Sequence, residues 1–292
     1  MRWGTVESTQ PKNTADQRQG ALHAVAEIGG EVFQFEKSLD SLLRSERLCS
    51  VRTRYDLEQL GGKKLEKAFE DLVLLAPVAR PEKILCVGLN YTDHAEEVGA
   101  ELPKYPTIFT KYANALVGPQ DDICMPTVSE KVDWEAELAV VMGRSCRNVT
   151  EENALEYVLG YTIVNDVSVR DWQGRTSEWF QGKNWDSMTP WGPCVVTPDC
   201  IDPQSGLEIS CTVNGERRQL GNTANMIFST AQVISYLSTF MTLAPGDVVA
   251  LGTPAGVGLS IRPRKWLAPG QKMVTVVEGI GQLENMCIET NT

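Results

Sequence analysis

The chain has 292 residues, of which 42% are hydrophobic, and its 27 basic and 38 acidic residues give a formal net charge of −11. This length and composition suit a globular enzyme with one large domain, or with one large and one small domain. The negative charge argues against a nucleic-acid or anionic-membrane partner, because both require clustered lysine and arginine, although a local basic residue can still bind an acidic substrate.

The N-terminal segment and the cysteines indicate the compartment. Residues 1–20 contain no apolar stretch of the signal-peptide kind, and no later run approaches the roughly 20 apolar residues that cross a bilayer. We therefore expect a soluble cytoplasmic protein with no membrane partner, and we leave organelle import open. Eight scattered cysteines without a CxxC pair indicate reduced, partly buried thiols.

The first eighty residues predict a small N-terminal domain rich in β-structure. RWGTVES and ALHAVAEIGGEVFQFE read as strands, with a hairpin at Gly29–Gly30 and a polar insertion from Thr9 to Gly20. A short helix is expected in SLDSLLRS. Prolines mark a boundary at residues 77–82, which divides the chain into an N-terminal domain, 1–80, and a main domain, 81–292.

Short β-like runs dominate the chain from Lys83 onward, separated by clusters of Gly, Pro, Asn and Asp. The runs are KILCVG, TIFTK, WEAELAVVMG, GYTIVND, LEISCTVNG, DVVALG and KMVTVVEG. The clearest helical stretches are NALEYVLG and STAQVISYLSTFM. This pattern predicts a mostly β (α+β) fold with a few helices, and it disfavours a doubly wound α/β sheet.

The first candidate active-site residues lie in NYTDHAEEVG. Asp93 and Glu96 have capping-box spacing, which predicts a short helix that starts at Asp93. His94 and Glu97 then share one helical face, and a histidine oriented by a carboxylate is a suitable base beside a carbonyl group. By local pattern alone, a surface helix with an acidic first turn explains these residues better.

Two carboxylates lie inside the apolar run VDWEAELAVVMG. Residues two apart in a strand face the same side, so Glu135 and Glu137 would project together and repel unless a cation lies between them. Asp166 ends the next apolar run. Three carboxylates, in a chain with only two histidines, suit a hard divalent cation, Mg²⁺ first, with Mn²⁺ or Ca²⁺ as alternatives. From spacing alone, a solvated strand face explains the glutamate pair equally well.

Three further segments carry polar side chains whose local patterns are weak. Arg170 and Gln173 lie in VRDWQ, where a structural salt bridge is as good an explanation for the arginine. Lys183 lies in FQGKNWDSM, and a lone lysine is usually solvated. Thr253 lies in the glycine-rich ALGTPAGVG, where glycines permit close backbone approach to an anionic oxygen, but most such turns bind nothing.

The order of five motifs resembles that of the fumarylacetoacetate hydrolase (FAH) family, especially its shorter acylpyruvase, oxaloacetate decarboxylase and oxaloacetate tautomerase group. The motifs are GLNYTDHAEE, VDWEAELAVVMG, VNDVSVRDWQ, QGKNWDSMTPWGP and ALGTPAGVG. The resemblance covers residues 83 to about 285 and implies a mixed β-roll catalytic domain, usually in a homodimer. It also implies that Mg²⁺ or Mn²⁺ is held by Glu135, Glu137 and Asp166.

The resemblance assigns roles to the other candidates. His94 and Glu97 would form a catalytic dyad on a segment that closes over the substrate. Lys183 would lie beside the metal and balance the negative charge of an enolate. The oxygens of the substrate would be bound by Arg170, Gln173 and Thr253.

The chemistry that the resemblance implies is enolate formation from a small oxo acid. The first interpretation is carbon–carbon bond cleavage, by hydrolysis or decarboxylation, of a 2,4-dioxo acid of the acylpyruvate type. Oxaloacetate keto-enol tautomerisation, or isomerisation, at the same site is the alternative. A catalytically silent metal-binding homologue is the alternative from a different class.

The segment SEWFQGKNWDSMTPW differs from the usual sequence of the family because it contains many aromatic residues. We expect these rings to shape a larger and more apolar pocket. The rings are those of Trp179, Phe180, Trp185 and Trp191.

Overall fold

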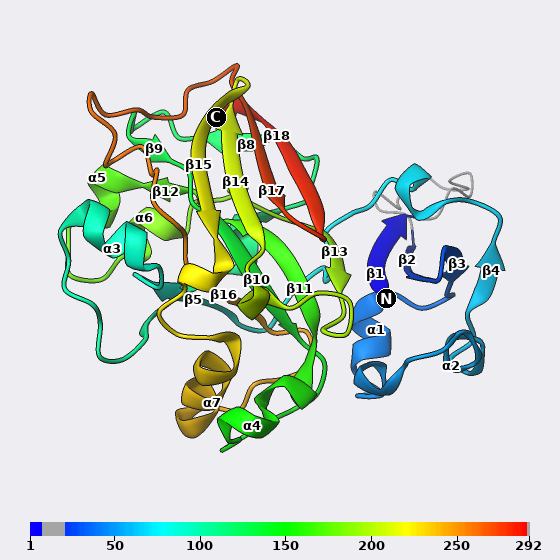
Figure 1. Ribbon diagram of the computed structural model, residues 1–292. Helices are drawn as coiled ribbons and strands as arrows, with labels where there is room; N and C mark the ends of the chain where they lie inside the picture. Colours follow the sequence, from blue (N-terminus) through cyan, green and yellow to red (C-terminus); the bar gives the residue numbers. More distant parts are fainter. Residues whose placement is uncertain (8–20, 291–292) are drawn as a thin grey trace.

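The computed structural model describes residues 1–7 and 21–290. Two large sheets and a few short helices make up this part of the chain (Figure 1), which confirms the predicted mostly β fold. The expected polar insertion, Thr9 to Gly20, lies outside the described residues. No helix in the described ranges is long and apolar enough to cross a membrane. All eight cysteines are unpaired, as predicted.

The larger sheet contains eleven strands within the described residues and draws on most of the length of the chain. In spatial order, its strands are β4 (Lys63–Leu65), β3 (Glu31–Gln34), β2 (Leu22–Ile28), β1 (Arg2–Glu7), β13 (Thr189–Val196), β11 (Val158–Asn165), β10 (Ala136–Met142), β16 (Val248–Ala250), β5 (Ile84–Gly88) and β6 (Thr107–Lys111). The remaining strand, β7 (Leu116–Val117), pairs with β13 beside this path.

Strands β10 and β11 form the centre of this sheet and pair antiparallel. Every residue of both strands is buried. Leu138 and Val140 pack into one apolar cluster, whereas Ala139 and Val141 pack into another, as expected for side chains that alternate between two covered faces. A charged group on β10 therefore lies away from water on either face.

The N-terminal strands continue the central sheet. The hairpin predicted at Gly29–Gly30 is confirmed, since β2 pairs antiparallel with β3 and both glycines have positive φ angles of 58° and 80°. Strand β1 pairs with β2 on one side and with β13 on the other, where Arg2 lies opposite Val196. The division of the chain at residue 80 stays a prediction.

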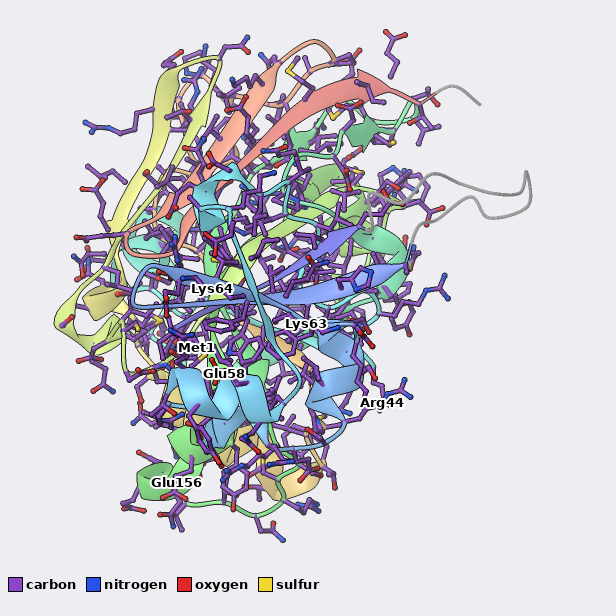
Figure 2. The ribbon with its side chains drawn as sticks, turned by 90° about the vertical axis from the view of Figure 1, so that its right-hand side faces the viewer. Met1, Arg44, Glu58, Lys63, Lys64 and Glu156 are labelled. Atoms are coloured by element: carbon purple, nitrogen blue, oxygen red, sulfur yellow. The ribbon has the colours of Figure 1, made fainter. Side chains whose placement is uncertain are left out.

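The outer edge of the large sheet is charged. Figure 2 shows Lys63 and Lys64 on the edge strand β4, where both side chains are exposed. They form ion pairs with Glu36 and Glu31, respectively. Charged side chains on an edge strand oppose its pairing with a strand of another molecule.

A second sheet packs against the first and closes the core. Its strands, in spatial order, are β15 (Glu216–Asn222), β14 (Glu208–Val213), β17 (Lys272–Val277), β18 (Gly281–Glu289) and β8 (Ile123–Met125). A separate pair is formed by β9 (Val132–Asp133) and β12 (Ser168–Val169). Strands β14 and β17 contact β10 or β11, so the second sheet covers one face of the centre of the first.

Seven short α-helices lie around the sheets in the described ranges. They are α1 (Leu39–Leu43), α2 (Arg54–Gln59), α3 (Thr92–Val98), α4 (Glu151–Ala154), α5 (Arg170–Gln173), α6 (Phe180–Lys183) and α7 (Thr230–Phe240). Helices α1 and α7 confirm two predicted helices. Figure 1 shows α3, α5 and α6 at the same end of the molecule.

Two details of the predicted helices were wrong. Helix α4 and a 3-10 turn end at Tyr157, and Val158 starts β11, because the apolar end of NALEYVLG pairs within the sheet. Helix α3 begins at Thr92 rather than at Asp93 and has no capping box. Asp93 instead accepts a hydrogen bond from the backbone N–H of His94 at 2.8 Å.

We expect Trp3→Ala to lower the free energy of unfolding by about 3–5 kcal/mol, as for other large-to-small changes in a core. Trp3, on β1, is fully buried in an apolar cluster, and its ring centroid lies 5.6 Å from that of Phe35. Urea-induced unfolding measures the loss, with Tyr55→Ala, at a side chain that is 67% exposed, as the control. Equal losses in the two variants would contradict the expected contribution of Trp3.

Candidate functional site

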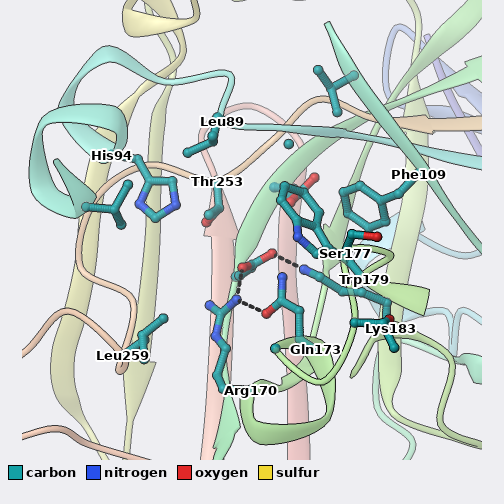
Figure 3. A pocket seen from close by; sticks show the side chains of 17 residues that line it. Leu89, His94, Phe109, Arg170, Gln173, Ser177, Trp179, Lys183, Thr253 and Leu259 are labelled. Atoms are coloured by element: carbon teal, nitrogen blue, oxygen red, sulfur yellow. Dashed lines mark hydrogen bonds and ion pairs between the residues drawn. The ribbon is translucent and has the colours of Figure 1, made fainter. Parts of the chain in front are cut away.

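A cavity of about 470 Å³ lies where β5, the start of β10, the turn after β16 and the helices α3, α5 and α6 meet (Figure 3). Seven of the nine candidate residues line this cavity: His94, Glu135, Glu137, Arg170, Gln173, Lys183 and Thr253. The other two, Glu97 and Asp166, do not line it but bond to His94 and Lys183, respectively. The fold thus brings together all nine residues, from five separate motifs.

Three of these residues, Glu135, Glu137 and Asp166, form a compact carboxylate group. They are 6%, 2% and 0% exposed, and oxygen atoms of all three lie within 4.8 Å of one another. Their burial excludes a solvated strand face. Glu135 itself precedes β10, so the strand begins two residues later than the predicted WEAELAVVMG run.

The backbone keeps Glu135 and Asp166 adjacent. The N–H of Glu135 donates to the side-chain oxygen of Asn165 at 3.0 Å, and the N–H of Asp166 donates to the carbonyl of Glu135 at 2.8 Å. The ends of β10 and β11 are therefore tied together at the point where the carboxylates converge.

Buried cations compensate two of the three carboxylates. The Nζ atom of Lys183 lies 2.7 Å from Glu135 and 2.6 Å from Asp166, and the Nζ of Lys111 lies 2.6 Å from the other oxygen of Asp166. Arg170 contacts Glu135 at 2.7 Å. Burial opposes ionisation of Glu135, but the charges of Lys183 and Arg170 outweigh it and hold the pKa of this carboxyl below its usual range.

Glu137 differs from its two neighbours. None of the ion pairs among the described residues involves Glu137, whose carboxylate accepts a hydrogen bond from the N–H of Gly252 at 2.9 Å. Burial, together with the charges of Asp166 and Glu135, raises the pKa of Glu137 well above its usual value. This side chain would ionise when a cation joins the group, and the all-oxygen donor set fits a hard divalent cation.

Helix α3 carries the predicted dyad. The Nδ1 atom of His94 lies 3.2 Å from one oxygen of Glu97, which confirms that the two side chains share a helical face. The other oxygen of Glu97 accepts a hydrogen bond from the N–H of Gly256 at 2.9 Å. Since Nδ1 faces Glu97, Nε2 is the ring nitrogen that remains for a ligand in the cavity.

Arg170 is held by three side chains and keeps one donor free. Its Nε donates to Asp133 at 2.8 Å, and its Nη1 donates to Gln173 at 2.9 Å as well as contacting Glu135. Its Nη2 is buried and has no partner among the described residues. A buried, unpaired guanidinium nitrogen beside a cavity suits an anionic oxygen of a ligand.

The hydroxyl group of Thr253 is already hydrogen-bonded. It donates to the carbonyl of Ala136 at 2.8 Å and accepts from the side-chain amide of Gln219 at 2.8 Å. Thr253 therefore ties the glycine-rich turn to β10 and β15, and its proton is engaged before a ligand arrives.

The expected aromatic wall is smaller than predicted. Trp179 lines the cavity, beside Phe109 at a ring-centroid distance of 5.3 Å. Phe180, Trp185 and Trp191 do not line it, because Phe180 packs on Tyr112, Trp185 on Trp172, and Trp191 in the core.

Sequence reasoning missed three residues that support this site, namely Lys111, Asp133 and Gln219. Lys111 ends the predicted TIFTK run, where a lysine normally faces solvent, yet it is 1% exposed. Asp133 stands beside Trp134 in an apolar run, and that context was an available signal of a buried acid. No local pattern marks Gln219, which donates to Thr253 and accepts from the N–H of Ala136 at 2.9 Å.

Comparisons with known proteins identify the family of this chain. Residues 83–288 match the family model described as fumarylacetoacetate (FAA) hydrolase C-terminal. The chain is 44% identical over 218 residues, 74% of this chain and 70% of the relative, to the mitochondrial oxaloacetate tautomerase Fahd2a of Rattus norvegicus.

Two solved structures of relatives share the fold. The fumarylacetoacetate hydrolase of psychrophilic Exiguobacterium antarcticum is 34% identical, with a TM-score of 0.83 over 99% of this chain and 100% of that one. The 5-carboxymethyl-2-hydroxymuconate delta-isomerase of Mycobacterium smegmatis is 32% identical, with a TM-score of 0.74 over 100% of both chains.

We expect the metal-free protein to lose stability as the pH rises. The folded-state pKa of Glu137 is raised, so the folded chain keeps a proton that the unfolded chain releases above about pH 4. The stability that this retained proton contributes is complete below the pKa of Glu137 in the unfolded chain. It is lost as the pH rises through the pKa of Glu137 in the folded chain. Mg²⁺ should replace the proton, so it should raise the melting temperature more at mildly alkaline than at mildly acidic pH.

Thermal unfolding with EDTA or with Mg²⁺, at both pH values, measures this effect. Glu137→Gln is the control, because its neutral side chain cannot titrate, and it should lose both the pH trend and the Mg²⁺ effect. An equal Mg²⁺ effect at the two pH values in the unmodified protein would contradict the replacement of a proton by the cation.

Proposed function

The chain belongs to the fumarylacetoacetate hydrolase family, and on that basis we propose that it is a divalent-metal-dependent oxaloacetate tautomerase. The observation that carries the proposal is the cavity in which three buried carboxylates, Lys183, Arg170 and the His94–Glu97 dyad converge. A relative that is 44% identical and named for this activity supports it. We therefore rank oxaloacetate tautomerisation, the alternative interpretation of the sequence, above carbon–carbon bond cleavage.

Glu135, Glu137 and Asp166 would hold the metal, for which Mg²⁺ is the first candidate. When bound, a divalent cation lowers the energy of the enolate of a 2-oxo acid. The chain itself supplies the remaining contacts. Arg170 would offer its free Nη2 to the carboxylate of the substrate, and Gln173, which lines the same wall, would hold the guanidinium group in place.

Tautomerisation shifts one proton between the carbon beside the carbonyl group and the carbonyl oxygen, with no net gain or loss of protons. His94 would transfer the carbon-bound proton through Nε2, because Glu97 orients the ring through Nδ1. Lys183 lies across the cavity with its ammonium group held between Glu135 and Asp166. Its positive charge would stabilise the negative charge that develops on the enolate oxygen.

Cleavage of a 2,4-dioxo acid is the second candidate. The same His94–Glu97 pair favours it, because a histidine oriented by a carboxylate can also activate water for attack on an acyl group. If the distal group were a carboxylate, the keto form would instead lose CO₂, and the electron pair of the broken carbon–carbon bond would form the enolate. All three outcomes use one site, so substrates rather than site residues distinguish them.

A panel of three assays tests the proposal. We expect Mg²⁺-dependent acceleration of the enol-to-keto conversion of oxaloacetate, followed by ultraviolet absorbance. Pyruvate release from acetylpyruvate, or CO₂ release from oxaloacetate, at a higher kcat/KM would favour the cleavage candidate. If no assay shows a Mg²⁺-dependent signal, the chain is a catalytically silent homologue.

Assembly and location stay proposals. We expect a homodimer, as is usual in this family, and light scattering would measure its mass. The sequence predicts a cytoplasmic protein, whereas the rat relative is named as mitochondrial, so cell fractionation is the relevant measurement. The expected partner is the small oxo-acid substrate, with no nucleic acid or membrane.

We expect two site variants to separate metal binding from proton transfer. Glu135→Ala should abolish Mg²⁺ binding in calorimetry. His94→Ala should keep Mg²⁺ affinity while its kcat falls by about 100-fold or more, as for the loss of a general acid–base.

His23→Ala is the matched control, since His23 is the other histidine of the chain and bonds to the carbonyl of Phe35 at 2.9 Å. It should keep the unmodified kcat. Full activity in the His94 variant would remove His94 as the base.

A further inference from the structure

Asp133 is a buried carboxylate that supports the site without lining the cavity. It is 0% exposed, and four donors surround its two oxygens. One oxygen accepts from the N–H of Trp134 at 2.9 Å and from the N–H of Gly258 at 2.6 Å. The other accepts from the N–H of Leu259 at 3.0 Å and from the Nε of Arg170 at 2.8 Å.

The first consequence concerns the direction of the Arg170 guanidinium group. This group is planar, so fixing two of its nitrogens fixes the third. Asp133 holds Nε, while Glu135 and Gln173 hold Nη1. The free nitrogen, Nη2, is thereby set in one direction, and Arg170 lines the cavity (Figure 3).

The second consequence concerns the glycine-rich turn, residues 252–259. Its start is held by Gly252, whose N–H donates to Glu137, and its end is held by Asp133. A Cβ atom on Gly258 would clash with the carbonyl oxygen of Lys265 and would lie 2.7 Å from an oxygen of Asp133, so this position requires glycine. Leu259, at the end of the turn, lines the cavity.

We propose that Asp133 is a positioning residue, which aims the free Nη2 of Arg170 at the substrate carboxylate and fixes the end of the glycine-rich turn that forms one wall of the cavity. The proposal rests on the proposed function for the identity of the ligand of Arg170. A purely structural aspartate would stabilise the chain equally but would leave substrate affinity unchanged. The two roles therefore differ in KM.

Asp247 provides a matched control. It is also 0% exposed, accepts hydrogen bonds from the N–H groups of Ala244 at 2.7 Å and Lys83 at 3.0 Å, and pairs with the Nζ of Lys83 at 2.8 Å. It does not line the cavity. The substitutions Asp133→Asn and Asp247→Asn each remove one buried charge from similar surroundings. Of the two aspartates, only Asp133 contacts Arg170.

The test measures kcat and KM for oxaloacetate with saturating Mg²⁺, together with binding of oxalate by calorimetry and the melting temperature. Oxalate is the probe because it presents negatively charged oxygens on two adjacent carbons, as the carboxylate and enolate oxygens of a 2-oxo acid enolate do. We expect Asp133→Asn to raise KM and the oxalate Kd about tenfold to a hundredfold, with a much smaller change in kcat and unchanged Mg²⁺ affinity. Asp247→Asn should lower only the melting temperature.

A double-mutant cycle with Arg170→Gln checks the route of the effect. If Asp133 acts through Arg170, Asp133→Asn should raise the oxalate Kd far less in the Arg170→Gln background than in the unmodified protein. Asp133→Glu keeps the negative charge and should bind oxalate more tightly than Asp133→Asn.

Three results would overturn the positioning role. They are equal KM values in Asp133→Asn and Asp247→Asn, fully additive effects in the cycle, and failure of both Asp133 variants to fold while Asp247→Asn folds. The last would make Asp133 a determinant of stability alone. Absence of both turnover and oxalate binding in the unmodified protein would instead reject the proposed function.

Discussion

Buried negative charge at the centre of the large sheet is the constraint on which the site depends. Glu135, Glu137 and Asp166 lie at the ends of β10 and β11, where both faces are covered by apolar side chains. A carboxylate in such a place is costly unless a cation or several N–H groups compensate it. Cationic compensation comes from Lys111, which precedes the carboxylates in the chain, and from Arg170 and Lys183, which follow them. Charge balance therefore draws α6 and β6 onto the end of β10.

The glycine-rich turn after β16 links the parts of the site to one another. Its N–H groups donate to Glu137 in the carboxylate group, to Glu97 in the dyad and to Asp133 beneath Arg170. Backbone donors suit this task because their positions follow from the path of the chain and cost no side-chain entropy. A shift of this turn would change metal binding, proton transfer and substrate binding together.

The sequence allowed most of the central strands and the three clustered carboxylates to be predicted, but not the side chains that bond to those carboxylates. The alternation in β10 and the two-residue spacing of Glu135 and Glu137 are local signals, and the structure agrees with both. Lys111 and Lys183 look like ordinary solvated lysines, because their burial depends on carboxylates that are distant in the chain. Strand β13 was missed because prolines interrupt its pattern. The start of α3 was misplaced because Tyr91, the residue before the helix, is held extended by its pairing with Met226. The residues next to Tyr91 in the sequence do not indicate this distant pairing.

The position of β16 in the large sheet has a consequence for synthesis of the chain. This strand, Val248–Ala250, lies between β5 and β10, parallel to the first and antiparallel to the second. During translation, strands β5 and β10 are complete long before their shared neighbour emerges from the ribosome. Until then both strands have unpaired edges, and such edges are prone to aggregation in the cell. Folding that is dominated by distant pairings is also slow. The nascent chain therefore depends on a late strand to complete its sheet, and it depends on chaperones for protection during the interval before that strand pairs.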